Sequence, residues 1–445
     1  MADIFPFRGI RYDLEKVGSL ANVTTPPYDV ISDEEQDLFY ERHPNNVIRL
    51  DKGKPTASDD SADNPYTRAA EYFKNWRADG VLQKDSTPCF YLTTVEFSIN
   101  GQTVTRYGLI ARVRLEPFEN GVILPHEETY SKIKSERLEL MKACHANFSH
   151  IFSVYTDKAG LIQTLKSAAS ELPPEVEFTD DARHHHKMWC IDDAPTQQTI
   201  ADALKNRRLF IADGHHRYET ALSYRDWIAS QTPDFSPDHP ANFIMMYLCS
   251  IEDKGLIILP THRLLTRVSE SERNTFVHKA EHYFDVQTFA FGKNREGQDQ
   301  AQTKLMAAMQ ANPDQHIIAG YIKGYPQFYV FTLKPGIMKQ KFAAEIPEPL
   351  RELDVTVLTR IILTELLDFD RADLDNETLI NYTSSAAEAI EAVDAGNHDM
   401  AFILNAPSNK QVRYIAEAGH TMPRKTTFYY PKAVTGQVMN SLTED

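Results

Sequence analysis

The stretch Arg208-Leu-Phe-Ile-Ala-Asp-Gly-His-His-Arg-Tyr-Glu-Thr-Ala-Leu222 decides the local fold of this chain. Its apolar run, Leu209 to Ile211, predicts a short buried strand, and the pair Asp213-Gly214 ends that strand. Apolar residues then recur at helical spacing from Tyr218 to Ile228. The polar residues between the two elements therefore lie at a strand-to-helix junction.

Such a junction suits an anion, because the first N–H groups of a helix have no partner within the helix and its dipole attracts negative charge. Arg217 adds a planar fork that matches phosphate or carboxylate. His215 and His216 could act in acid/base chemistry, as metal ligands or as simple hydrogen-bond donors. In the plainer alternative, Asp213 caps the helix and the histidines pack or face water.

Composition predicts a globular protein that carries no transmembrane segment. The 445 residues include 47 basic and 63 acidic ones, and the net charge of −16 opposes non-specific binding to nucleic acid or anionic membrane. No apolar run approaches the roughly 20 residues that cross a bilayer, and the first residues do not read as a signal peptide. The four cysteines are far apart, which is typical of reduced, structural thiols. We expect a cytoplasmic protein of unknown oligomeric state.

Strand-like and helix-like segments alternate along the chain, which predicts a mixed α/β (α+β) protein. A change in the sequence pattern after about residue 268 predicts two regions, 1–268 and 269–445. Within the first, Asn100-Gly101 predicts a hairpin, the segment His43 to Leu50 reads as the entry to a strand, and Asp51 to Pro65 reads as an exposed loop. His184 to His186 form a histidine tract, for which plain solvent exposure is favoured over metal binding.

Two further segments of the first region carry possible chemistry. In Pro26-Pro27-Tyr28-Asp29, the prolines restrict the backbone and present a phenol and a carboxylate on a rigid loop, although the same residues make an ordinary turn. The segment Pro125 to Leu138 concentrates acidic and basic residues that could clamp a phosphorylated ligand and its Mg²⁺, or could form a solvated start of a helix.

Two other segments follow later in the chain. His262 and Arg263 come directly after a buried strand, where ligand sites collect in α/β folds. The segment Met422 to Gly436 is basic, aromatic and rich in hydroxyl groups, and it predicts a tail that folds back onto the protein, or else a final edge strand with Lys425 and Lys432 exposed.

Taken together, these motifs resemble a bacterial and archaeal family catalogued as a domain of unknown function, and the resemblance runs the full chain. The residues that carry it are Pro-Pro-Tyr-Asp-Val-Ile (26–31), His-Pro-Asn-Asn-Val-Ile-Arg-Leu (43–50), Pro-His-Glu-Glu-Thr (125–129), Asp-Gly-His-His-Arg-Tyr-Glu-Thr-Ala (213–221) and Met-Pro-Arg-Lys-Thr-Thr-Phe-Tyr-Tyr-Pro-Lys (422–432). Members of the family are often encoded beside enzymes of serine biosynthesis, which implies serine or phosphoserine as a substrate.

The Asp-Gly-His-His-Arg turn is also similar to the phosphate-binding turn of the ParB/sulfiredoxin-like fold, which includes chromosome-partitioning nucleotidases, sulfiredoxins and kinases of free serine. This resemblance implies a ParB/sulfiredoxin-like core in region 1–268 and a second α/β domain in 269–445, whose tail completes the site. The sulfiredoxin cysteine is absent, because His215 and His216 follow Gly214, so reduction of a sulfinic acid is not expected. ParB-type DNA binding is not expected either, because the chain is acidic and no helix-turn-helix pattern follows.

The resemblance implies a phosphotransferase that acts between ATP or ADP and the hydroxyl of a small metabolite, with Mg²⁺. The residues implied in catalysis are Asp29, Glu127, His215 and His216. Those implied in nucleotide binding are Asp213, Gly214, His215, His216, Arg217, Lys134, Arg137 and Lys425; in substrate binding, Tyr28, His126, His262, Arg263 and Thr426; and in metal binding, Glu128 and Asp213.

Two alternatives stay open at this point. In the first, water replaces the nucleotide in the same pocket, and the protein is a phosphatase of phosphoserine or a related ester. In the second, the protein is not an enzyme but senses a nucleotide or a metabolite and regulates a partner.

Overall fold

Two units make up the chain in the computed structural model. Residues 2–99, 101–127, 131–157, 159–205, 207–292, 295–312 and 315–443 are described, and for 131–134 the backbone alone is described. Unit 1 comprises Met1–Ile257 together with Tyr429–Asp445, and unit 2 comprises Ile258–Phe428. The chain therefore leaves unit 1, builds unit 2 and returns to unit 1 for its last residues.

Unit 1 is built around a mixed sheet of nine strands among its described residues. β12 lies inside the sheet with all of its residues buried, pairing parallel with β8 and antiparallel with β5. The strands follow the order β6 (Ile123–Leu124), β11 (Leu209–Asp213), β8 (Ile151–Tyr155), β12 (Phe243–Ser250), β5 (Gln102–Arg114), β4 (Phe90–Ile99), β10 (His185–Ile191) and β9 (Val176–Thr179), and β1 (Ile4–Phe5) also pairs with β5.

The main helices of unit 1 are α3 (Asp33–Arg42), α4 (Ile48–Asp51), α5 (Pro65–Ala78), α6 (Ser131–Cys144), α7 (Leu161–Glu171), α8 (Ala194–Leu204) and α9 (His215–Gln231). α9 packs Tyr218, Ala221 and Tyr224 into the same apolar core as the strand residues Ile211 and Met246. α6 contacts both α9 and α5. The helix after the glycine turn is therefore anchored by burial along one side, which fixes where its first residues lie.

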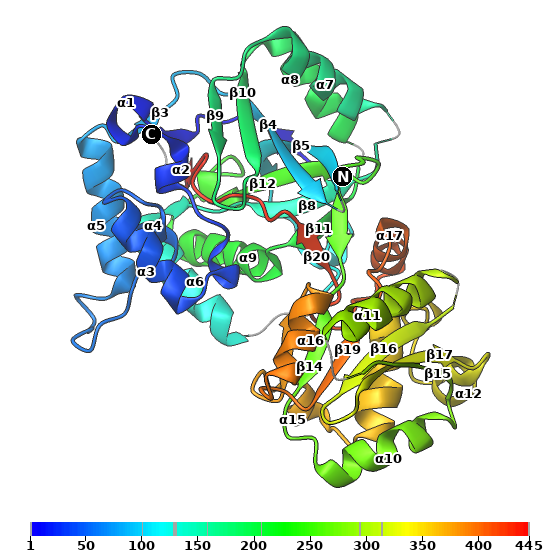
Figure 1. The fold of residues 1–445 in the computed structure, drawn as a ribbon. Helices are drawn as coiled ribbons and strands as arrows, with labels where there is room; N and C mark the ends of the chain where they lie inside the picture. Colours follow the sequence, from blue (N-terminus) through cyan, green and yellow to red (C-terminus); the bar gives the residue numbers. More distant parts are fainter. Residues whose placement is uncertain are drawn as a thin grey trace. The chain divides into compact units, whose positions relative to one another are not determined.

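The last residues of the chain return to unit 1 and are held there by strand pairing and by a buried arginine. β21 (Asn440–Ser441) pairs with β7 (Ala146–Asn147). Arg106, which is 1% exposed, donates to the carbonyl of Pro431 at 2.7 Å and to the Tyr247 hydroxyl at 3.1 Å. The red C-terminal segment accordingly runs beside β8 and β11 (Figure 1).

Unit 2 has an antiparallel sheet with the order β15 (Phe284–Ala290), β17 (Gln327–Leu333), β16 (Ile317–Ile322), β19 (Met400–Ile403), β14 (His262–Leu265) and β18 (Ile380–Thr383). Its main helices include α10 (Glu270–Ala280), α11 (Arg295–Gln310), α16 (Ala386–Asp394) and α17 (Asn409–Glu417). α11 and α16 contribute to one apolar cluster of this unit, and α10 contributes to another. The alternating strands and helices confirm the mixed α/β class predicted from sequence.

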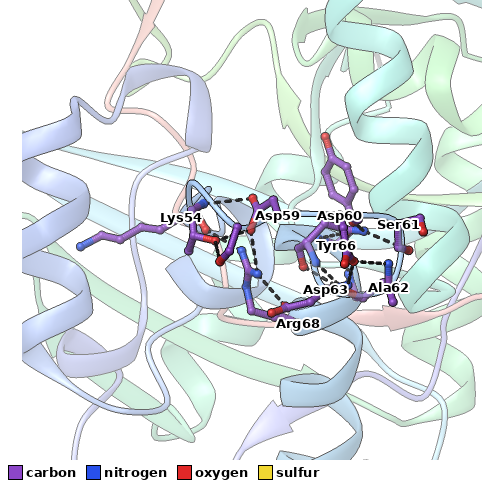
Figure 2. A network of polar contacts seen from close by, with 12 residues as sticks. Lys54, Asp59, Asp60, Ser61, Ala62, Asp63, Tyr66 and Arg68 are labelled. Carbon is purple, nitrogen blue, oxygen red and sulfur yellow. Dashed lines mark hydrogen bonds and ion pairs between the residues drawn. The ribbon is translucent and has the colours of Figure 1, made fainter.

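The hairpin predicted at residues 100–101 is present, although Asn100 itself lies outside the described residues. β4 pairs antiparallel with β5, and Ile99 lies opposite Gln102. The predicted exposed loop Asp51–Pro65 is exposed at residues 55–58 and 60–63, whereas Asp51 is buried at the end of α4 and Pro65 begins α5. Figure 2 shows how the loop is ordered: Arg68 of α5 binds Asp59 at 2.9 Å and Asp63 at 2.6 Å.

The expectation of a strand within His43–Leu50 was wrong. Residues Ile48–Asp51 form the short helix α4. The side chain of Asn46, which precedes the helix, accepts the N–H of Ile48 at 2.9 Å. Ile48 and Leu50 are fully buried. A short apolar run is compatible with either element, and here packing within the unit selects the helical turn.

The division between the units differs from the one expected near residue 268. β14 pairs with β18 and β19, so its residues belong to unit 2, and the last segment belongs to unit 1 because Met439 pairs with Ile10 and β21 with β7. In the described part of the chain, we find no helix long and apolar enough to cross a membrane.

Candidate functional site

The glycine turn after β11 positions the start of α9. Gly214 has φ +91° and precedes the first helical residue, and its carbonyl accepts the N–H of Tyr218 at 3.0 Å. Among the described residues no side chain caps this helix, so Asp213 does not play the capping role that the plainer interpretation gave it. The first turn of α9 therefore presents its positive end beside Asp213.

Asp213 is held between two cations. Lys432 Nζ lies 2.6 Å from its Oδ1, and Arg217 Nη2 lies 2.6 Å from its Oδ2. Burial by itself would raise the pKa of this carboxyl, but Lys432 and Arg217 together hold the pKa well below its ordinary value. Asp213 is therefore an ionised carboxylate with both oxygens engaged.

Arg217 folds back across the glycine turn. Its Nη1 donates to the carbonyl of His150 at 2.6 Å, and a Cβ on Gly214 would lie only 2.9 Å from its Nε. Burial acts to lower the pKa of Arg217, yet the negative charges of Asp213 and Asp29 raise it overall. Arg217 is consequently a buried, permanently charged group that lies close enough to Asp29 to interact with it electrostatically.

Tyr28 lies beside a second buried ion pair. The guanidinium of Arg137 lies 4.1 Å from the centre of the Tyr28 ring, donates to the Asp51 carbonyl at 2.5 Å and pairs with the Asp51 carboxylate. Burial raises the pKa of Tyr28, against the opposing effect of Arg137 and Arg217. Asp51 is 3% exposed, and among the described residues its Oδ2 has no hydrogen-bond partner.

His126 packs against His215, the residue that follows the glycine turn. The backbone N–H of His126 donates to His215 Nε2 at 3.2 Å, and the ring centres are 4.6 Å apart. His126 Nδ1 donates to the Ile211 carbonyl, which fixes its tautomer, and its Nε2 lies 3.8 Å from Glu127 Oε1. Burial lowers the pKa of His126, and burial followed by the proximity of His126 lowers the pKa of His215 further. Both imidazoles are therefore neutral at physiological pH.

The structure brings together much of the predicted site within unit 1. Contacts or electrostatic interactions connect these expected residues: Tyr28, Asp29, His126, Glu127, Arg137, Asp213, Gly214, His215, His216 and Arg217. Glu128 lies outside the described residues, and only the backbone of Lys134 is described. Motifs separated by almost two hundred positions thus meet at the start of α9.

Four expected residues belong to unit 2 instead, namely His262, Arg263, Lys425 and Thr426. His262 is 2% exposed, its Nδ1 accepts the N–H of Leu404 at 3.2 Å, and burial lowers its pKa to about 4. Arg263 donates to the Lys425 carbonyl at 3.0 Å. With Thr426 it lines a cavity of about 620 Å³. These residues form a group of their own within unit 2.

Sequence reasoning missed three residues of unit 1 that contact the candidate site. Lys432, which was weighed only as an exposed lysine, is the residue that reaches Asp213. Asp51 follows directly after the His43–Leu50 motif and pairs with Arg137, while His150 supplies the carbonyl that receives Arg217. Lys432 and Asp51 were within or next to quoted motifs, so proximity to a motif was the available signal, whereas nothing in the sequence marked His150.

A family model described as "Protein of unknown function (DUF1015)" matches residues 4–356. The chain belongs to this family. The match includes the Pro-Pro-Tyr-Asp, Pro-His-Glu-Glu and Asp-Gly-His-His-Arg motifs, and so confirms the family resemblance seen in the sequence. No curated protein matches the chain.

Three solved structures are partly similar to this DUF1015 protein. A conserved hypothetical protein from Pyrococcus furiosus is 12% identical and aligns over 72% of this chain and 93% of its own, with a TM-score of 0.33. A free serine kinase in complex with AMP is 12% identical over 73% and 89%, with a TM-score of 0.33. A C-terminally truncated SbnI from Staphylococcus aureus is 11% identical over 73% and 86%, with a TM-score of 0.35. Similarity at this level assigns no activity to the chain.

Proposed function

We propose that this protein transfers a phosphoryl group between an adenine nucleotide and the hydroxyl group of a small metabolite, with serine or phosphoserine as the substrate pair. The observation that carries the proposal is the cluster at the start of α9, where Arg217 and Lys432 flank the carboxylate of Asp213 beside an uncapped helix end. Phosphoryl transfer requires mainly positioning and neutralisation of charge, and this cluster offers both. The choice of serine rests on the sequence resemblance alone.

In this proposal the phosphate oxygens of the nucleotide lie at the first turn of α9. Gly214, His216 and the cations Arg217 and Lys432 hold them there, because backbone N–H groups and fixed positive charges both attract phosphate. Each guanidinium has five N–H donors, and the contacts of Arg217 to Asp213 and His150 use only part of them. Arg137, which packs against Tyr28 and interacts electrostatically with Arg217, adds further positive charge.

The base of the reaction is Asp29 or Glu127. One of these carboxylates accepts the proton of the substrate hydroxyl group. The hydroxyl oxygen then bonds to the transferred phosphorus, and the bond from phosphorus to the leaving nucleotide oxygen breaks. His215 takes a positioning role, because its imidazole is buried and neutral and its Nε2 already accepts a backbone N–H. The proton acceptor is therefore sought among the carboxylates.

The described residues fit phosphate better than they fit Mg²⁺. Of the two ligands expected from sequence, Glu128 lies outside the described residues, and both oxygens of Asp213 are engaged by Lys432 and Arg217. Mg²⁺ prefers several oxygen ligands in near-octahedral geometry, which a carboxylate held between two cations does not readily supply. No step of the proposal is assigned to the ion.

The test is an assay of the full chain with ATP and a panel of hydroxyl metabolites headed by serine, and with ADP and phosphoserine for the reverse direction. We expect transfer of phosphate with serine, and a loss of at least about 100-fold in kcat/KM for Arg217→Ala. His185→Ala, which replaces a partly exposed histidine outside the cluster, serves as the control.

Three results would decide against the proposal. Release of phosphate from phosphoserine without ADP would make the protein a phosphatase, and equal activity of Arg217→Ala and His185→Ala would remove the α9 cluster from the reaction. Tight nucleotide binding with no turnover over the whole panel would favour a sensing protein.

A further inference from the structure

A second polar cluster lies at the other end of the unit 1 sheet. Asp180, His184 and His186 place one carboxylate oxygen and two imidazole nitrogens within 4.8 Å of one another. Asp180 Oδ2 lies 3.1 Å from His184 Nδ1 and 2.9 Å from His186 Nε2. The three side chains therefore converge on a single point. Among the described contacts, none links these side chains to Asp213, Arg217 or Lys432 of the α9 cluster.

The β9–β10 hairpin explains why these residues meet. Successive side chains of a strand point to opposite faces, so His184 and His186 share one face and His185 faces the other. His185 Nε2 accordingly pairs with Glu177 at 2.7 Å. Asp180 joins the pair from the turn, because its Oδ1 accepts the N–H of His184 at 2.9 Å. The histidines expected to be solvent-exposed are instead 7% (His184) and 4% (His186) exposed.

Both histidines are also held by a further contact. His184 Nε2 lies 2.9 Å from the Tyr430 hydroxyl, and the His186 ring stacks on Phe178 with centres 4.8 Å apart. Support of this kind orients metal-binding histidines, because the partner of the second ring nitrogen fixes the tautomer and the direction of the first. With Nδ1 used as a ligand, His184 would donate its Nε2–H to the Tyr430 oxygen.

We infer that Asp180, His184 and His186 bind a divalent transition-metal ion, of which Zn²⁺ fits best. Two imidazoles and one carboxylate are a donor set that suits Zn²⁺ and Fe²⁺ and not Mg²⁺, which prefers oxygen ligands. In a tetrahedral Zn²⁺ site with bonds of about 2.0–2.1 Å, ligand atoms are about 3.3 Å apart. The separations of 3.1 Å and 2.9 Å between Asp180 Oδ2 and the two histidine nitrogens are close to this value, and all three ligand atoms lie within 4.8 Å of one another. The fourth position would be taken by water.

The metal would fix the return of the C-terminal segment. Tyr430, the partner of His184, lies two positions before Lys432 in the sequence, and Lys432 binds Asp213. An ion at the hairpin would thus stabilise the segment that delivers Lys432 to the α9 cluster. The inference does not depend on the proposed function, because metal binding is measured without any assay of phosphate transfer.

The experiment measures Zn²⁺ binding to the full chain after removal of metal with a chelator. We expect the wild-type protein to take up one equivalent of Zn²⁺, and His184→Gln and His186→Gln to bind it more than about 100-fold more weakly. His185→Gln, which removes the adjacent histidine on the opposite face, should bind as the wild type does. Tyr430→Phe, which keeps the ring and removes only the hydroxyl, should weaken binding about 10- to 100-fold.

Two controls keep the result interpretable. Circular dichroism shows whether each variant is folded, and the near-isosteric Asp180→Asn provides a third test if a histidine variant does not fold. Co²⁺ loaded into the wild-type protein should give the intense visible absorption of a tetrahedral site, which Zn²⁺ abolishes and Mg²⁺ does not. Absence of Zn²⁺ uptake by the wild-type protein, or equal weakening by His185→Gln and His186→Gln, would show a purely hydrogen-bonded cluster and overturn the inference.

Discussion

Lys432 Nζ lies 2.6 Å from Asp213 Oδ1, although 219 positions of sequence separate the two residues. The contact joins the segment that returns from unit 2 to the glycine turn at the start of α9. Because Arg217 binds the other oxygen of the same carboxylate, two cations converge on one residue at the end of β11. This convergence is the basis of the proposed phosphate site.

Replacement of Lys432 by Met should lower turnover by at least about 100-fold, because it removes one of the charges that would neutralise the transferred phosphate. Lys432→Arg should restore part of the activity, since it keeps the charge with a different shape. Steady-state kinetics would measure both variants, and Lys279→Met, which replaces an exposed lysine of α10, is the control. Full activity of Lys432→Met would exclude this lysine from the reaction.

Substitution of Gly214 by Ala should destabilise unit 1 more than substitution of Gly160 by Ala. Both glycines precede a helix with positive φ, +91° and +75°, so both variants pay about 1–2 kcal/mol for the left-handed backbone. The new Cβ at Gly214 also meets Arg217 at 2.9 Å, whereas a Cβ at Gly160 meets no atom of the described residues within 4 Å, its chain neighbours apart. We expect an additional loss of about 1–3 kcal/mol at Gly214.

Unfolding of unit 1 can be followed separately, because all three tryptophans, Trp76, Trp189 and Trp227, belong to it. Denaturant titrations read by tryptophan fluorescence would give the two free energies of unfolding. Equal destabilisation by the two glycine variants would mean that the Arg217 side chain moves aside without cost.

Burial lowers the pKa of His150 to about 3, so His150 should make the stability of unit 1 sensitive to acid. The folded-state pKa lies below the unfolded value of about 6.5, and the stability it confers is complete above pH 6.5. It is then lost as the pH falls toward the folded pKa, by up to about 1.4 kcal/mol per pH unit.

The variant His150→Leu should therefore lose stability less steeply than the wild-type protein between about pH 6.5 and pH 3. His278→Gln, whose side chain is 86% exposed in the wild-type protein, should leave the pH profile unchanged. Tryptophan fluorescence in denaturant at a series of pH values provides the measurement. Parallel profiles for His150→Leu and the wild-type protein would contradict the expectation.

Replacement of Arg106 by Met should loosen the C-terminal segment. Arg106 is buried and donates to the Pro431 carbonyl and the Tyr247 hydroxyl, and hydrogen bonds from a charged donor contribute about 1.5–3 kcal/mol each. We expect unit 1 to lose about 3 kcal/mol of stability and the residues after 428 to become sensitive to limited proteolysis. Arg208→Met, at an exposed position of the same unit, should leave the cleavage pattern as it is.

The local elements followed closely from sequence patterns. The hairpin that joins β4 and β5 was predicted, and the segment from Leu209 to Ile228 was predicted as strand, turn and helix in the observed order. In each case the apolar periodicity or the glycine turn lies within a few residues of the element it specifies. The helical turn at Ile48 was missed because a short apolar run fits both helix and strand.

The sequence by itself determined the family, the mixed α/β class and the strand, turn and helix around Gly214, because these depend on motifs, hydrogen bonds and side-chain periodicity over a short window. Only the tertiary structure decided that Lys432 reaches Asp213, that Asp51 faces Arg137, and that His184 and His186 are buried with Asp180. These contacts depend on the packing of distant segments against one sheet, which no local pattern encodes.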